Sequence, residues 1–184
     1  RIPLKGSLGD VLTRAREEME AGRRVVVLAD GDPLFFGIGK RVIEAVGSDH
    51  VELHPNVTAL QAAAVRIRVP WDQVKTVSLH GRKDLWPLLR ALVGCYHVGV
   101  FTDGVNHPAA IAKELRRRTV HSFRMWVFEN LWQEDERIGS YELDEPEGLN
   151  FSALNFVILE RTGFPEIPLR LGLSDDHYMH ERGL

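Results

Sequence analysis

The sequence predicts an α/β protein with two domains, the first built on a mainly parallel sheet. Strand-like and helix-like patterns alternate up to about residue 118, as they do in βα repeats. Residues 25–29 form an unbroken apolar run rich in β-branched side chains, which is typical of a parallel strand covered on both faces. After about residue 120 strand patterns predominate. We therefore expect an N-terminal α/β domain over residues 1–120, a strand-rich α/β domain over residues 121–162, and an extension or linker over residues 163–184.

The predicted helices are marked by apolar residues at helical spacing and by residues that start or end helices. A glycine follows each of the first two, Pro87 is tolerated in a first turn, and Pro108 suits the first helical position. The predicted helices cover residues 8–19, 38–46 and 84–93. Two further helices are expected, one after Thr58 and one that starts at Pro108. Besides residues 25–29, the expected strands cover residues 51–53, 74–79, 97–102, 124–129, 138–143 and 153–159.

The composition limits the classes of partner. The chain has 184 residues, with 23 Lys and Arg against 26 Asp and Glu, so no bulk positive field favours nucleic acid or an anionic membrane. Its single cysteine, Cys95, can form no internal disulfide, which fits a reducing cytoplasm. No apolar run approaches the roughly 20 residues that span a bilayer. The chain does not begin with Met, so we expect a segment upstream of Arg1.

Loops that directly follow strands are candidate sites, because ligands of open α/β sheets bind beyond the carboxyl ends of the strands. In residues 31–39, glycines let the backbone approach a ligand and Asp32 can accept hydrogen bonds, although Gly-Asp-Pro is also a common turn. Thr58 can cap a helix whose free N–H groups suit a carboxylate. In residues 78–83 an imidazole and two cations precede a helix start, where cations are unfavourable; this indicates either a ligand or a solvated loop.

Four segments together carry a more specific signal. They are Val-Val-Leu-Ala-Asp-Gly-Asp-Pro-Leu-Phe-Phe-Gly-Ile-Gly at 26–39, Ser-Leu-His-Gly-Arg at 78–82, Phe-Thr-Asp-Gly-Val-Asn-His-Pro at 101–108, and Phe-Glu-Asn-Leu at 128–131. In this order they resemble the tetrapyrrole methylases of corrin biosynthesis, in particular the members that methylate carbon 5 of a precorrin. The resemblance covers nearly the whole chain.

The resemblance implies the tetrapyrrole methylase fold: two α/β domains, with S-adenosylmethionine (SAM) held in a cleft between them, usually in a homodimer. It implies methyl transfer to carbon 5 of a precorrin, from precorrin-7 to precorrin-8 or between the cobalt forms. The positions that match the family's cofactor contacts are Gly31, Asp32, Phe35, Thr58, Ala59, Thr102, Asp103 and Asn155. Because a precorrin carries many carboxylates, the candidates for substrate binding are His80, Arg82, Lys83 and His107.

Two departures from the family pattern matter. The family begins with a strand and a Gly-rich loop, and no such loop lies near the start of this chain. Asp30 stands where relatives often have Ser before Gly-Asp-Pro, and its charge could favour a sulfonium cation. The tail from residue 171 to residue 180 resembles the junction before a fused second methyltransferase domain. His177 and His180 in that tail lack an upstream ligand cluster, so we expect no metal.

Two alternatives stay open. A tetrapyrrole methylase of another specificity, or a diphthine-synthase-like methyltransferase, would share the fold and the cofactor. A catalytically silent cofactor-binding domain is the alternative from outside the enzymes. The sequence identifies no catalytic acid or base.

Overall fold

A computed structural model describes residues 7–163 of the chain, which divides into two compact units, Arg1–Thr58 and Ala59–Leu184. We call them the first and second unit and describe each by itself. The division differs from the expected boundary after residue 120. The strands on the two sides of that position share one sheet, so a boundary there would have to cut a continuous hydrogen-bonded ladder.

The first unit contains helices α1 (Leu8–Glu20) and α2 (Gly39–Val46) and a short 3₁₀ turn (Ser48–His50). Both helices were predicted. A capping box starts α1: the Ser7 hydroxyl accepts from the Asp10 N–H, and the Asp10 carboxylate accepts from the Ser7 N–H. Gly47, at φ 88°, ends α2 in a conformation that suits glycine.

The prediction of strands at residues 25–29 and 51–53 is wrong. Both segments lack strand pairing, and Val26 and Leu28 are 74% and 73% exposed. An apolar run becomes a strand only when a neighbour accepts and donates its main-chain hydrogen bonds. Among the described residues of the first unit, no strand fills that role.

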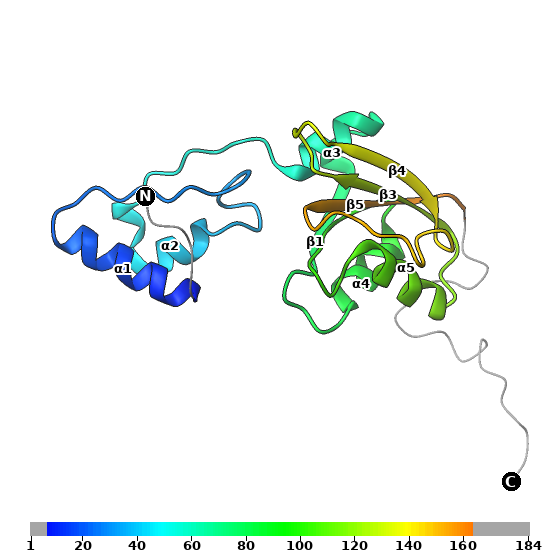
Figure 1. Cartoon of the computed structure of the whole chain (residues 1–184), viewed down its shortest axis with the longest axis horizontal. Helices are drawn as coiled ribbons and strands as arrows, with labels where there is room; N and C mark the ends of the chain where they lie inside the picture. The colour runs from blue at the N-terminus through cyan, green and yellow to red at the C-terminus, as the bar shows by residue number, and fades with distance from the viewer. Residues whose placement is uncertain (1–6, 164–184) are drawn as a thin grey trace, which may run out of the picture. The chain divides into compact units, whose positions relative to one another are not determined.

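The described residues of the second unit form one five-stranded sheet in the order β1-β2-β5-β3-β4 (Figure 1). β1 and β2 are parallel, as predicted, and every other neighbouring pair is antiparallel. The predicted mainly parallel character therefore ends at β2, because β5 returns from the end of the described chain to pair beside it. The strands are β1 (Val74–Ser78), β2 (His97–Phe101), β3 (Phe123–Glu129), β4 (Arg137–Glu142) and β5 (Asn155–Arg161).

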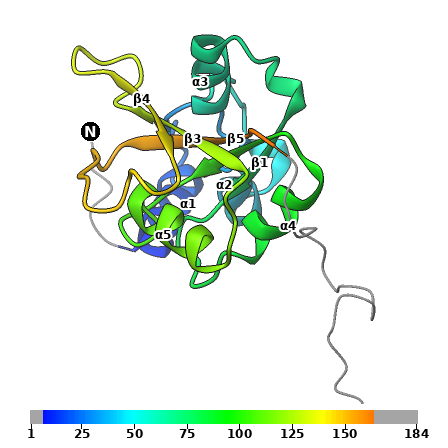
Figure 2. The same ribbon diagram turned by 90° about the vertical axis from the view of Figure 1, so that its right-hand side faces the viewer.

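Helices cover both faces of this sheet. Figures 1 and 2 show α4 (Trp86–Gly94) and α5 (Pro108–Arg117) on one face and α3 (Ala59–Ile67) on the other. The main core lies under α4 and α5, where apolar side chains from β1, β2, β3, β5 and both helices are buried, and Tyr141 of β4 packs against them. On the α3 face, Gly99 leaves space for Phe156, whose ring would lie 2.8 Å from an added Cβ. These layers of helices on a sheet confirm the predicted α/β class.

Three further points concern the extent of the chain. Most of the expected extension, with His177 and His180, lies outside the described residues. Within residues 7–163, no helix is both long and apolar enough to cross a bilayer. The same residues contain no group of three or more His, Cys, Asp or Glu side chains arranged to hold a metal ion.

Candidate functional site

The Gly-Asp-Pro loop of the first unit is a tightly closed turn. The carboxylate of Asp32 accepts from the Leu34 N–H at 2.7 Å, and its main-chain carbonyl accepts from the Phe35 N–H at 3.1 Å. One oxygen of the carboxylate therefore fixes the loop. Later in the loop, Phe35 and Phe36 form an edge-to-face pair of rings with centroids 5.0 Å apart.

Close backbone packing makes glycine necessary in this loop. A Cβ on Gly37 would lie 2.6 Å from the Pro33 carbonyl oxygen, well inside any real contact. Gly31 adopts φ 63°, and a Cβ there would lie 3.6 Å from the Cα of Thr58. The structure thus brings the predicted residues Gly31, Asp32 and Thr58 into one neighbourhood of the first unit.

A second group of predicted residues lies at one edge of the sheet in the second unit, where parallel strands β1 and β2 end. The Thr102 hydroxyl, just after β2, lies 2.8 Å from Oδ1 and 3.0 Å from the main-chain oxygen of Asn155, the first residue of β5. The Asn155 amide in turn donates to the Ser152 carbonyl at 2.7 Å. These two predicted cofactor residues are therefore in direct contact, although 53 positions separate them.

Asp103 follows Thr102 and accepts hydrogen bonds from two loops. Its Oδ1 accepts from the N–H groups of Val105 and Asn106 at 2.9 and 2.6 Å, and its Oδ2 accepts from the Gly81 N–H at 2.6 Å. The hydrogen bond from the Asn106 backbone is the main cause that holds the pKa of Asp103 below its usual value, with Gly81 and Val105 adding to it against the opposing effect of burial. Both carboxylate oxygens are engaged with the protein.

The four predicted substrate residues are all exposed. Arg82 uses its Nε to donate to the Ser78 carbonyl at 2.9 Å, which leaves its terminal nitrogens without a partner among the described residues. The Nδ1 of His107 accepts from the Ala110 N–H and so caps the start of α5. His80 and Lys83 flank Arg82 on the turn that follows β1.

The sequence interpretation did not single out two polar residues, Asn106 and Glu129, that the structure places at or beside this edge. Asn106 is buried and donates its amide to the carbonyls of Leu79 and Arg82. Glu129 is 5% exposed, lies opposite Asn155 in the sheet, and accepts from Arg137 at 2.8 Å. The sequence carried one signal for Glu129, a carboxylate directly after the apolar run 125–128.

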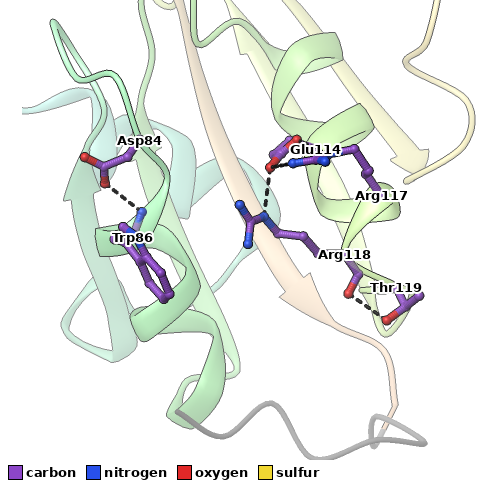
Figure 3. A network of polar contacts seen from close by, with 6 residues as sticks. All are labelled: Asp84, Trp86, Glu114, Arg117, Arg118 and Thr119. Atoms are coloured by element: carbon purple, nitrogen blue, oxygen red, sulfur yellow. Dashed lines mark hydrogen bonds and ion pairs between the residues drawn. The ribbon is translucent and has the colours of Figure 1, made fainter. Parts of the chain in front are cut away.

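A cavity of about 350 Å³ is lined by residues in and next to α4 and α5, among them Lys83, which follows this turn, and Asn106. Figure 3 shows two polar groups from its lining: Asp84, which accepts from the Trp86 N–H at 3.0 Å, and Glu114, which accepts from Arg117 and Arg118 at 2.8 Å. These contacts are satisfied within the protein. Hydrogen bonds within the protein therefore hold these polar groups of the cavity lining in place.

In the described residues of the second unit, polar side chains at the ends of β2 and β5 thus lie near the cationic turn after β1. The polar side chains at this edge hold loops in place, and cationic groups remain exposed around them. Such a surface can orient a polyanionic ligand.

Comparisons with known proteins identify the family of the chain. Residues 3–147 match the tetrapyrrole (corrin/porphyrin) methylases. The chain is 33% identical over 138 residues to the cobalt-precorrin-7 C(5)-methyltransferase of Salmonella typhimurium, and the match covers 75% of this chain but only 66% of that relative.

Two solved structures are similar as well. The precorrin-6Y methylase of cobalamin biosynthesis from Archaeoglobus fulgidus is 28% identical, with a TM-score of 0.64, over 88% of this chain and 74% of that one. The uroporphyrin-III C-methyl transferase of Thermus thermophilus, in complex with S-adenyl homocysteine, is 25% identical, with a TM-score of 0.65, over 84% of this chain and 74% of that one. The family match extends over well more than half of the chain, and the chain belongs to the tetrapyrrole methylase family.

Proposed function

We propose that this protein transfers a methyl group from SAM to carbon 5 of a precorrin, with or without cobalt, in cobalamin biosynthesis. The observation that carries the proposal is the 33% identity to a relative named for this reaction. The predicted function, enzyme class and cofactor all agree with that relative and with the S-adenyl homocysteine complex of a structural neighbour.

The Gly-Asp-Pro loop fits one part of such a cofactor. One oxygen of Asp32 holds the loop, and the carboxylate retains capacity to accept from a ribose hydroxyl or an amino group. Gly31 adopts φ 63° and has no side chain of its own to cover its main-chain groups. We propose Gly31 and Asp32 as cofactor contacts on this basis, and Phe35, Thr58 and Ala59 because they match the family's contact positions.

The edge of the sheet in the second unit supplies the remaining proposed groups. Thr102 and Asn155 share a hydrogen bond and are proposed as further cofactor contacts. Because both carboxylate oxygens of Asp103 are engaged, a cofactor contact at this position fits its main chain better than its side chain. His80, Arg82, Lys83 and His107 are proposed to face the carboxylates of the macrocycle.

The mechanism we propose needs no strong protein nucleophile. When bound, SAM would supply the methyl group from its sulfonium: the new bond to the macrocycle carbon would form as the methyl–sulfur bond breaks, and S-adenosylhomocysteine would leave with that electron pair. The residues of the chain then hold and orient the two reactants and exclude water, which lowers the entropic part of the barrier. The exposed cations fix the position of the macrocycle through its carboxylates and do not touch the reacting carbon.

The experiment supplies precorrin-7 or its cobalt form, with SAM, to the protein expressed from its complete reading frame. We expect one added methyl group at carbon 5, located by mass spectrometry and carbon NMR. Methylation at carbon 15, or loss of carbon dioxide, would contradict the proposed specificity. Cofactor binding without turnover on any tetrapyrrole would favour the silent-domain alternative.

The remaining expectations are part of the same proposal. We propose a homodimer in the cytoplasm, since the family resemblance and the single cysteine favour these. A fused second methyltransferase domain is proposed from the tail that resembles such a junction. Sedimentation of the complete protein tests the homodimer. The sequence of its reading frame tests the fused second domain.

A further inference from the structure

Two neighbouring loops of the second unit are joined by a small hydrogen-bonded network. The turn after β1, residues 79–82, contains two of the proposed substrate residues, and the loop after β2, residues 102–107, lies beside it. Asp103 accepts from the Gly81 N–H, and Asn106 donates to the carbonyls of Leu79 and Arg82. Each end of the turn is therefore held by a side chain of the other loop.

The geometry makes this network specific to one conformation of the turn. Gly81 adopts φ 70°, in the left-handed region that other residues rarely occupy, so the turn has few alternative shapes that keep these bonds. The amide of Asn106 donates to Leu79 and Arg82 at 2.9 and 3.0 Å, and its side chain is buried. A buried amide group that loses its hydrogen-bond partners costs free energy, so the hydrogen-bonded conformation of the turn is favoured.

The orientation of Arg82 follows from the same network. Its Nε donates to the Ser78 carbonyl at 2.9 Å, while its own carbonyl accepts from Asn106 at 3.0 Å. The guanidinium is thus directed from a fixed main chain, and its terminal nitrogens have no partner among the described residues. A cation held in advance loses less entropy when it binds a carboxylate.

We propose that Asp103 and Asn106 are positioning residues that hold the 79–82 turn so that its exposed cationic side chains bind the carboxylates of the macrocycle. The inference rests on the proposed function for the identity of the ligand. In this proposal the side chains of Asn106 and Asp103 both hold the 79–82 turn, and the Asp103 carboxylate does not contact the cofactor. Neither side chain touches the reacting atoms in this assignment.

The test uses the complete protein and two probes that need no turnover: uroporphyrin III, a tetrapyrrole polycarboxylate, followed by absorbance, and S-adenosylhomocysteine, followed by calorimetry. The variants are Asn106→Ala, the shape-conserving Asn106→Asp and Asp103→Asn. The matched control is Trp126→Phe, which removes a 2.7 Å hydrogen bond to Glu160 at the opposite end of the sheet. Amide hydrogen exchange at Gly81 reports the turn directly.

We expect the three variants to bind uroporphyrin about tenfold more weakly, which corresponds to roughly one lost hydrogen bond. The Gly81 amide should exchange at least about tenfold faster in all three variants, and in the two Asn106 variants S-adenosylhomocysteine affinity should change less than about twofold. In turnover, KM for the macrocycle should rise while kcat stays near the control. Circular dichroism selects the variants that remain folded, and Asn106→Asp and Asp103→Asn keep the inference testable if Asn106→Ala unfolds.

Different failures separate the two proposals. Faster exchange at Gly81 with unchanged uroporphyrin affinity would overturn the positioning role and leave the proposed function intact. Absence of methyl transfer by the wild type, with weakened uroporphyrin binding in the variants, would overturn the proposed reaction and support the positioning role. No uroporphyrin binding by the wild type would overturn the inference itself.

Discussion

Asp32 has two separable tasks in the proposed site, because one carboxylate oxygen holds its own loop. The Leu34 N–H donates to Oδ1 at 2.7 Å, so removal of the side chain disturbs the loop as well as any ligand contact. We predict that Asp32→Ala weakens S-adenosylhomocysteine binding by about 1.5 to 3 kcal/mol, the usual contribution of a hydrogen bond to a charged group. Isothermal calorimetry on the complete protein measures this change.

Asp32→Asn separates the two tasks, since an amide oxygen can still accept from Leu34. We expect an intermediate loss of affinity, because the charge is removed and the loop is kept. Asp49→Asn, at another exposed carboxylate of the first unit, serves as the control and should bind as the wild type does. Wild-type affinity in both Asp32 variants would restrict the loop's contribution to its backbone.

At the scale of one element, α5 carries a charge network with a defined pH response. Hydrogen bonds from Arg117 and then from Arg118 lower the pKa of Glu114 from 4.5 to about 2 (Figure 3). A lowered carboxylate pKa means that the stabilisation is complete above the pKa of the unfolded chain and is lost as the pH falls. We predict that the stability difference between wild type and Glu114→Gln is constant above about pH 5 and shrinks between about pH 4.5 and pH 2.

Urea unfolding of both proteins at several pH values measures this difference. Because Arg117 and Arg118 are exposed, salt should reduce the difference at neutral pH. A difference that grows on acidification would have the wrong sign for a lowered pKa and would remove Glu114 as the group responsible.

Residues 25–28 test how a strand-like sequence behaves without a partner strand. Their main-chain groups form no hydrogen bond within the described residues, and the segment lines a cavity of about 870 Å³ in the first unit. We predict that their amides exchange at rates close to those of an unfolded chain, whereas residues 98–100 of β2 are strongly protected. Mass-resolved hydrogen exchange on this chain checks the contrast, and equal protection in both segments would show that residues 25–28 are paired.

For the whole molecule, the two units differ in the apolar surface that they bury. Among residues 7–58 only Gly39 and Thr58 are buried, whereas the second unit has a continuous core beneath α4 and α5. Since burial of apolar surface is the main source of stability, we predict that the first unit unfolds at lower urea than the second. All four tryptophans lie in the second unit, so the first phase should appear in the helical circular dichroism and be absent from tryptophan fluorescence.

Ligand binding gives this prediction a second readout. The Asp32 loop belongs to the first unit, so S-adenosylhomocysteine at about 100 times its Kd should raise the stability of that phase by up to about 2.7 kcal/mol. Coincident transitions by the two probes would show that the units unfold together.

The sequence by itself determined the α/β class, the helices, the five strands that form the sheet, and the family. These depend on local periodicity and on ordered motifs, which are present in the chain before it folds. It also named Thr102 and Asn155, which the structure brings into contact.

Only the tertiary structure decided which strand patterns find partners and which polar groups are already satisfied. Residues 25–29 have a strand sequence, yet pairing depends on a second segment whose position no local pattern encodes. β5 pairs with β2 across more than fifty residues, so the expected boundary after residue 120 divides a single sheet. The engagement of the Asp103 carboxylate by Gly81 is equally non-local, because hydrogen-bond satisfaction belongs to the folded arrangement and not to the residue type.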